Sequence, residues 1–231
     1  MVKEKRYKRP QTVGEEIANS VSHGVMALFG IYALVAMLIR VSSYSGEQFG
    51  WALLAIIVFG VSIILLYTSS TLYHALAFTK SKGVFKRFDH LSIYMLIGGT
   101  FAPTLLLLPA LRQTPFLGVD FFLDAGLSLF LIQWGLIITG MVMKSIWVYK
   151  YQALHIAIFL LIGWSAVMFI TDLYLFSQNA TYLIIFGGLS YTIGVVFYAL
   201  SNKRYFHFIW HIFVALGTIL QFLAIYIYLI P

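Results

Sequence analysis

The residues of this chain that could do chemistry are few, and the most closely spaced histidines among them are His207 and His211. Side chains four residues apart lie on the same face of a helix, where two imidazoles could hold one metal ion. The alternative is a pair of interfacial histidines that face lipid head groups, with Trp210 as an anchor at the same level. The pair alone does not choose between these two interpretations.

Ser70 and His74 are also four residues apart. A serine in a membrane helix often only bonds its own backbone, so this spacing is weak by itself. It gains weight because His74 is predicted to lie about as deep in the membrane as His211, at a rise of about 1.5 Å per residue. Three imidazoles from two helices, His74, His207 and His211, could then meet at one level.

Asp89 and His90 stand at the expected start of another helix. Aspartate is favoured as an N-cap, and Asp89 could in addition be a partner of a metal ion, directly or through water. Since His90 is one residue away on a helix, it should point elsewhere, and we do not expect it among the same ligands. His155 is expected to be an interfacial residue that faces water.

Glu16, Asn19 and His23 step along one face of the first predicted helix. A glutamate near a helix N-terminus, either Glu15 or Glu16, also complements the helix dipole. We expect Glu16, Asn19 and His23 to form a supporting network behind the metal ligands rather than to bind the metal themselves.

The composition indicates where these residues lie. Of the 231 residues 61% are hydrophobic and only 10% are charged, whereas an ordinary soluble domain carries about 25% charged residues. This composition excludes a soluble domain and a disordered chain, and it predicts an integral membrane protein. Cysteine is absent, which excludes disulfides, thiolate-bound zinc and iron–sulfur clusters. The net charge of +7 could suggest a nucleic-acid partner, but basic residues more often mark cytoplasmic loops, so none is predicted.

Seven apolar runs are long enough to cross a bilayer, and each should be a helix because lipid cannot satisfy open backbone groups. The predicted fold is therefore all-α, a polytopic bundle of seven transmembrane helices. Residues 1–17 form a basic N-terminal segment, and residues 18–231 form the membrane domain. The runs span roughly 18–40, 51–78, 88–108, 119–143, 152–175, 180–200 and 206–230.

The loop charges give the direction of the bundle. Thirteen of the fifteen Lys and Arg residues fall before the first run or in alternate connections, and only Arg40 and Arg112 fall on the other side. Cytoplasmic loops carry the Lys and Arg excess, so the N-terminus is predicted inside and the C-terminus outside, in a bacterial cell membrane. All six histidines then lie near the cytoplasmic ends of their helices. Gly98, Gly99 and Pro103 could shape a cavity in the third helix or serve only its packing.

Three imidazoles with one open position describe a catalytic zinc site. Zinc lowers the pKa of a bound water to about 7 and polarises a carbonyl group. Asp89 could orient or deprotonate that water, and Ser70 could hydrogen-bond a developing oxyanion. In the inner leaflet such a site would meet a lipid amide or ester, so membrane lipids are the expected substrate or ligand.

Taken together, the spacing of Glu16, Asn19 and His23, the Ser70–His74 segment, the Phe88–Asp89 pair and the His207–His211 segment resemble the hemolysin III branch of the progestin and adipoQ receptor family. The resemblance covers nearly the whole chain. It implies seven helices around a zinc ion near the cytoplasmic face, with His74, His207 and His211 as ligands, Asp89 linked through water and Ser70 close by. Adiponectin receptors of the family are linked to ceramidase activity, and bacterial members are linked to haemolysis and membrane-lipid homeostasis. The long N-terminal domain of the receptors is absent from this sequence, so hormone binding is not implied.

Three functions remain open at this stage. The chain could be a zinc-dependent hydrolase of lipid amides or esters, a non-enzymatic homeostasis protein or sensor with structural zinc, or a pore-forming cytolysin. A pore needs a polar stripe across the whole bilayer, whereas the polar residues here gather on one side. A retinal protein needs a lysine in the seventh helix, and residues 205–231 contain none. Haem bound by two histidines is less favoured than zinc because Asp89 accompanies the histidines. No protein partner or oligomeric state is predicted.

Overall fold

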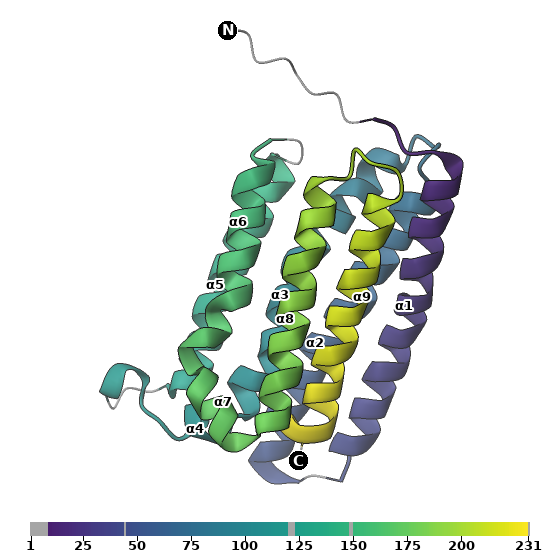
Figure 1. Cartoon of the computed structure of the whole chain (residues 1–231). Helices are drawn as coiled ribbons and strands as arrows, with labels where there is room; N and C mark the ends of the chain where they lie inside the picture. Colours follow the sequence, from purple (N-terminus) through teal and green to yellow (C-terminus); the bar gives the residue numbers. More distant parts are fainter. Residues whose placement is uncertain (1–8, 44, 120–122, 148–149, 231) are drawn as a thin grey trace, which may run out of the picture.

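Seven helical spans, each long and apolar enough to cross a membrane, make up most of the chain in the computed structural model (Figure 1). The structure describes residues 9–43, 45–119, 123–147 and 150–230. Those residues contain no β-strand, only an isolated bridge between Pro115 and Asp124. The predicted all-α bundle of seven membrane helices is confirmed, and the protein is a multi-pass integral membrane protein of the cell membrane.

The elements follow one another with short connections, and the fifth span combines α6, η2 and α7. Its central part, η2, has 3-10 geometry. The elements are α1 (Val13–Val41), α2 (Gly46–Ala75), α3 (Lys82–Leu107), α4 (Pro109–Arg112), η1 (Phe116–Gly118), α5 (Ala125–Ile146), α6 (Gln152–Gly163), η2 (Trp164–Phe169), α7 (Ile170–Phe176), α8 (Gln178–Ala199), α9 (Phe206–Ala224) and η3 (Ile225–Leu229).

The first three helices, α1, α2 and α3, begin five or six residues earlier than hydropathy predicts. α1 begins at Val13, where Thr12 and Glu15 form a capping box: the Glu15 amide donates to the Thr12 hydroxyl at 3.3 Å, and the Thr12 amide donates to the Glu15 carboxylate at 2.9 Å. α3 begins at Lys82, with Ser81 as its N-cap. The interpretation of Asp89 as an N-cap is therefore wrong. Hydropathy missed the start of α3 because its first turns are basic and extend beyond the apolar layer.

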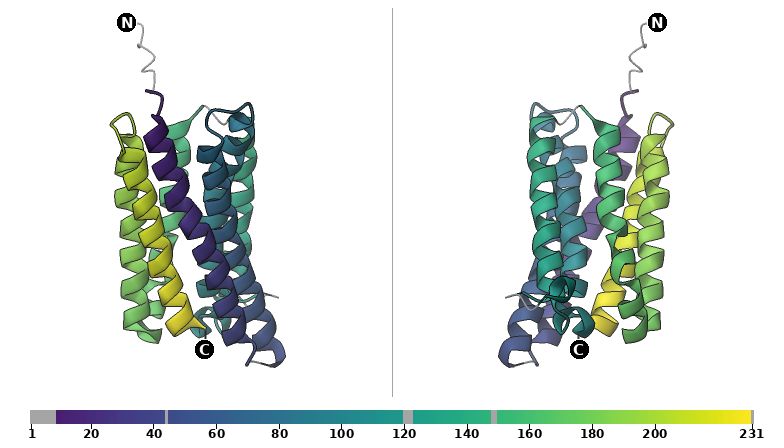
Figure 2. Two further views of the ribbon diagram at one scale, coloured as in Figure 1. Left: turned by 90° about the vertical axis from the view of Figure 1, so that its right-hand side faces the viewer. Right: turned by 90° about the vertical axis from the view of Figure 1, so that its left-hand side faces the viewer.

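α1 lies at one edge of the bundle and runs obliquely between α9 and α2 (Figure 2). α8 and α9 pack along each other, and α3 packs against both α2 and α5. One face of α1 exposes aliphatic side chains such as Val21 and Leu28, as expected for contact with lipid. The opposite face buries the polar residues that sequence analysis singled out at its beginning.

Gly98 and Gly99 let α3 approach its neighbours closely. A Cβ on Gly99 would overlap the Ser62 side chain of α2, and one on Gly98 would press on Ile137 of α5. Of the two interpretations of these glycines, the structure supports close packing. α3 is thereby held against the two helices that carry His74 and Lys144.

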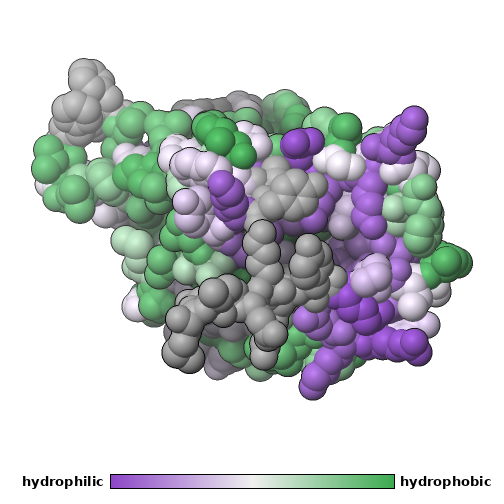
Figure 3. Space-filling model, turned by 90° about the horizontal axis from the view of Figure 1, so that it is seen from above, coloured by the Kyte–Doolittle hydropathy of each residue, from purple (hydrophilic) through white to green (hydrophobic). Residues whose placement is uncertain are grey.

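Most of the described basic residues gather at the end of the bundle where the chain begins, which we call the basic end. Figure 3 views this end and shows hydrophilic residues concentrated over one half of it. Arg40 lies in the last turn of α1 and Arg112 ends α4, both at the opposite end. Lys3, Lys5, Arg6 and Lys8 lie outside the described residues. Placement of the basic end in the cytoplasm remains a prediction from the charge distribution.

Candidate metal centre

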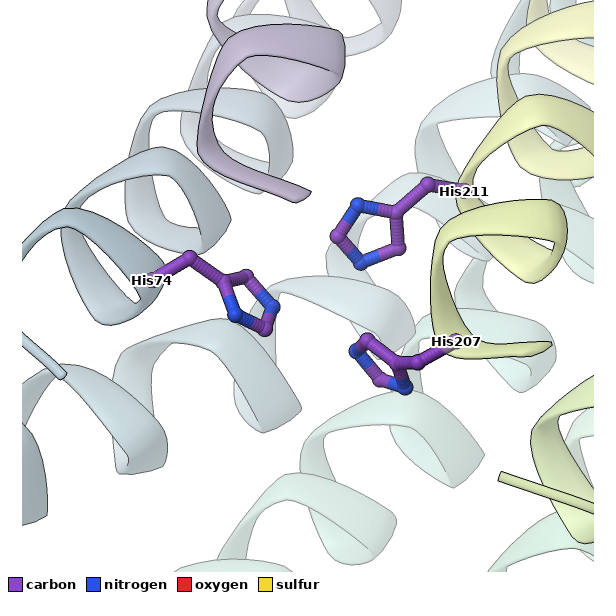
Figure 4. A group of neighbouring side chains, drawn as sticks. All are labelled: His74, His207 and His211. Carbon is purple, nitrogen blue, oxygen red and sulfur yellow. The ribbon is translucent and has the colours of Figure 1, made fainter. Parts of the chain in front are cut away.

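Three histidines converge at the basic end of the bundle. His74 comes from the last turn of α2, and His207 and His211 come from the first turns of α9 (Figure 4). One ring nitrogen of each lies within 4.8 Å of the others. His74 and His211 are buried and His207 is half-buried. The i, i+4 spacing in α9 places His207 and His211 on one face, and the His74 side chain of α2 reaches both, with ring centroids 5.1 and 5.0 Å away. These are the three imidazoles that the sequence predicted to meet.

The donor set fits a metal ion. Two imidazole nitrogens bound tetrahedrally to zinc at about 2.0–2.1 Å are separated by roughly 3.4 Å, so shifts of about an ångström would close the observed set. The Nε2 atom of His74 is buried and has no hydrogen-bond partner among the described residues. A buried nitrogen without a hydrogen-bond partner destabilises the protein unless a ligand binds it. A metal ion would be such a ligand, and it could be shared with the two neighbouring imidazoles.

Glu16 orients His74 for this role. Its carboxylate Oε2 lies 2.6 Å from His74 Nδ1, and its Oε1 lies 3.5 Å from the ammonium of Lys82. A carboxylate that accepts the Nδ1 proton fixes the tautomer in which Nε2 is free to bind metal. The Asn19 side-chain amide also lies 3.5 Å from His74 Nδ1, and it donates to Gln11 at 2.9 Å.

His211 is oriented by the backbone of α1 and covered by a second imidazole. Its Nδ1 lies 3.3 Å from the Asn19 carbonyl oxygen and 3.4 Å from the Ser22 hydroxyl. The His23 ring stacks on the His211 ring with centroids 3.5 Å apart, and its far side meets Tyr67 edge-on at 4.8 Å. The predicted network residues Glu16, Asn19 and His23 therefore contact His74 or His211 directly.

Glu15, which was expected only to complement the helix dipole, links α1 to the start of α9. Its carboxylate accepts from the Tyr205 backbone amide at 2.8 Å, just before the helix that carries His207 and His211. Arg9 donates to the same carboxylate at 2.8 Å, and these hydrogen bonds raise the pKa of Arg9. The capping-box pattern around Glu15 was visible in the sequence, but nothing there indicated a bond to residue 205.

Asp89 and Ser70 lie beside the three histidines. Both line the same cavity as His74, and the Asp89 carboxylate interacts electrostatically with His74. Asp89 is 15% exposed and lies 3.3 Å from His90 Nδ1. The Ser70 hydroxyl is buried and lies close enough to the Asp89 carboxylate to interact with it. As expected, His90 is not part of the three-histidine group.

The cavity below the histidines has a volume of about 650 Å³, within the usual range of roughly 300–1,000 Å³ for small-molecule sites. Its mouth is polar and basic, with Arg9, Lys82 and Lys86 in the wall. Its deeper wall is mostly apolar and reaches Thr104 and Gln221. Since Asp89 and Thr104 are fifteen residues apart on α3, the cavity is roughly 22 Å deep.

The expectation that His155 faces water is wrong. Its side chain is 1% exposed, and its Nδ1 lies 2.7 Å from the Tyr94 hydroxyl of α3. The residue was expected at an interface because it is close to the end of its span. Its burial results from the packing of α6 against α3 and α5, which the sequence of α6 alone does not specify.

Comparisons with known proteins agree with this architecture. The sequence model of a family described as Haemolysin-III related matches residues 11–222, a range that includes all three histidines. The chain is 34% identical over 218 residues to the Hemolysin-3 homolog of Bacillus subtilis (strain 168), covering 94% of this chain and 95% of that relative. It is 33% identical over 232 residues to Hemolysin-3 of Bacillus cereus, covering 99% and 98%. It is 28% identical over 231 residues to the human Monocyte to macrophage differentiation factor, covering 97% and 87%.

Proposed function

This chain belongs to the haemolysin-III-related family, the hemolysin III branch of the progestin and adipoQ receptor family, and from this premise we propose that it is a zinc-dependent intramembrane hydrolase of a lipid amide or ester. The observation that carries the proposal is the position of the three histidines at the polar end of a deep and mostly apolar cavity. A scissile carbonyl would lie at the histidines, and acyl chains would extend toward Thr104 and Gln221.

Zinc is the metal that this donor set favours. Imidazole suits zinc among the common metals, and three protein ligands leave one position open, as in catalytic rather than structural sites. The ion would polarise the substrate carbonyl and lower the pKa of a water molecule to about 7. His74, His207 and His211 would bind it, while Glu16 and the Asn19 carbonyl hold His74 and His211 in the required orientation.

Asp89 and Ser70 are the residues that we assign to the reaction. The Asp89 carboxylate would take a proton from water while the water oxygen forms a bond to the carbonyl carbon. The Ser70 hydroxyl would donate a hydrogen bond to the charge that develops on the carbonyl oxygen. When the C–N or C–O bond breaks, Asp89 would return the proton to the leaving amine or alcohol, and the other product would be a fatty acid.

Fatty-acid release from defined amide-linked and ester-linked lipids tests this proposal. Purified zinc-loaded protein should release fatty acid, measured by mass spectrometry. Asp89→Asn should lower the rate by about 100- to 10,000-fold, with zinc still bound at saturating metal. Asp172→Asn, an equal change in α7 outside the cavity wall, should keep the wild-type rate.

Two outcomes would contradict the proposal. If the zinc-loaded wild type hydrolyses neither class of lipid, the zinc would be structural and the protein a sensor or homeostasis factor. If Asp89→Asn retains the wild-type rate, the assignment of the proton transfer would be wrong.

The name of the Bacillus cereus relative, Hemolysin-3, favours a cytolysin as a second candidate. A channel needs a polar path across the bilayer. The cavity wall described above ends near Thr104 and Gln221, and beyond it Leu108 and Leu111 are buried in the apolar core. Liposome conductance that survives replacement of all three histidines would favour the cytolysin.

A further inference from the structure

A second cluster of polar side chains lies at the basic end, on the far side of α3 from His74. Lys144 of α5 and His155 of α6 line a small recess of about 20 Å³. His90, Gln152 and Tyr198 line both this recess and the main cavity, so the two share a wall. Neither Lys144 nor His155 has a role in the proposed reaction.

Lys144 is an unusual residue in this position because it is buried. Only 2% of the residue is exposed, far less than is expected of a lysine that snorkels to the membrane surface. No carboxylate of the described residues lies within 4.0 Å of it. The nearby acid, Asp89, contacts His90 and lines the main cavity but not the recess. A buried cation without an acidic partner is costly, and an anion would remove that cost.

His155 presents a donor to the same recess. The Tyr94 hydroxyl lies 2.7 Å from His155 Nδ1 and has no other acceptor among the described residues, so we assign Tyr94 as the donor, which leaves the ring proton on Nε2. That Nε2 is buried and has no hydrogen-bond partner within the part of the chain that the structure describes. The ring is thus fixed on one side by α3 and unsatisfied on the other.

The start of α6 adds to the positive character of the recess. Gln152 and His155 lie in the first turn of α6, and the side chain of its N-cap residue, Tyr151, does not cap that turn. The backbone N–H groups of a helix N-terminus and the helix dipole favour an anion there. The lysine, the imidazole and the helix start therefore converge from α5 and α6 on one point.

We propose that this recess binds the phosphate of a lipid head group. A space of about 20 Å³ holds about one water-sized atom, so one phosphate oxygen would enter between Lys144 and His155. The rest of the phosphate would remain in the main cavity beside His90, where Lys86 also lines the wall. The inference rests on the proposed function, because it takes the acyl chains of the lipid to occupy the main cavity. It narrows the proposed substrates to lipids that carry a phosphate group.

Binding of matched lipids to the purified full-length protein tests the inference. Native mass spectrometry would compare phosphatidic acid with diacylglycerol of the same acyl chains, and inorganic phosphate would be tested separately by thermal shift. Phosphatidic acid should bind at least tenfold more tightly than diacylglycerol. Lys144→Gln and His155→Gln should each remove most of that preference.

The matched control is Lys150→Gln, which removes one positive charge from an exposed residue of the same end and should keep the preference. Lys144→Arg retains the positive charge and should keep part of the preference for phosphatidic acid. This variant separates the loss of the charge from misfolding. Equal binding of the two lipids, or equal loss in Lys144→Gln and Lys150→Gln, would overturn the inference. Stabilisation by inorganic phosphate that phosphatidic acid does not match would overturn the assignment to a lipid.

Because the readout is binding, it does not depend on turnover. His74→Ala should lose metal and hydrolysis while it keeps the preference for phosphatidic acid. Failure of the proposed hydrolase and failure of the phosphate site would therefore be seen separately.

Discussion

Two polar clusters, the three-histidine group and the recess lined by Lys144 and His155, lie at the same end of this bundle on opposite sides of α3, and they differ in the charge around them. The candidate metal centre has the carboxylate of Glu16 at 2.6 Å from His74 and has Asp89 nearby. The recess has the ammonium of Lys144, and no described carboxylate lines it. An imidazole can bind either a metal ion or an anion, because its unprotonated nitrogen coordinates metal and its protonated nitrogen donates a hydrogen bond. The neighbouring charge decides which ligand each cluster favours.

Removal of the metal should have the largest effect, and it should affect the three-histidine cluster but not the recess. A chelator should lower the free energy of unfolding by about 4 kcal/mol if the free metal had been a thousandfold above its Kd. Amide hydrogen exchange should then rise around His207 and His211 but not in α6 around His155. Uniform loosening of both regions would show that the metal does not act locally.

Glu16→Gln should weaken zinc binding about 10- to 100-fold, because the neutral amide no longer holds the Nδ1 proton of His74. Isothermal titration with zinc would measure the change. The control is Lys82→Met, which removes the exposed partner on the other carboxylate oxygen of Glu16 and should change the affinity little. Equal effects of the two substitutions would mean that Glu16 acts only through general charge.

The two glycines of α3 test how each cluster is positioned. Gly99→Ala should shift α2 and weaken metal binding, whereas Gly98→Ala should shift α5 and weaken phosphate binding. Each should destabilise the protein by about 1–3 kcal/mol, with Gly99→Ala the larger because its Cβ would also meet the Val58 carbonyl at 3.0 Å.

Gly135→Ala is the control, since nothing lies within 4 Å of a Cβ there. Thermal unfolding and the two binding assays would report all three variants. Metal binding reduced equally by Gly98→Ala and Gly99→Ala would contradict the separate positioning of the clusters.

The smallest effect is expected from Tyr94→Phe, which removes one hydrogen bond to His155 and keeps the ring packing. A loss of about 1 kcal/mol, or roughly fivefold in the preference for phosphatidic acid, should appear in the lipid-binding assay. Zinc affinity should not change. An altered zinc affinity would mean that the two clusters are coupled through α3.

Much of the fold followed from the sequence because lipid imposes simple rules. Seven apolar runs separated by polar connections could hardly form anything but helices. The i, i+4 spacing of His207 and His211 and the matched depth of His74 also predicted which imidazoles would meet. These signals are local, and each can be read along a single helix.

The features that the sequence did not reveal depend on contacts between helices. Hydropathy placed the start of α3 at residue 88, and only the structure shows that Asp89 lies in its second turn. The burial of His155 depends on Tyr94, sixty-one residues away. The bond from Glu15 to the Tyr205 amide spans 190 residues. Long-range pairs of this kind leave no periodic signal in one sequence.

The most direct test of the central claim is the zinc content of the purified protein. We predict about one zinc per chain in the wild type and almost none in His74→Ala or His211→Ala. The control is His155→Ala, which removes a buried imidazole at the same end and should keep the full zinc content. Normal zinc in either ligand variant, or equal loss in His155→Ala, would contradict a metal centre formed by His74, His207 and His211.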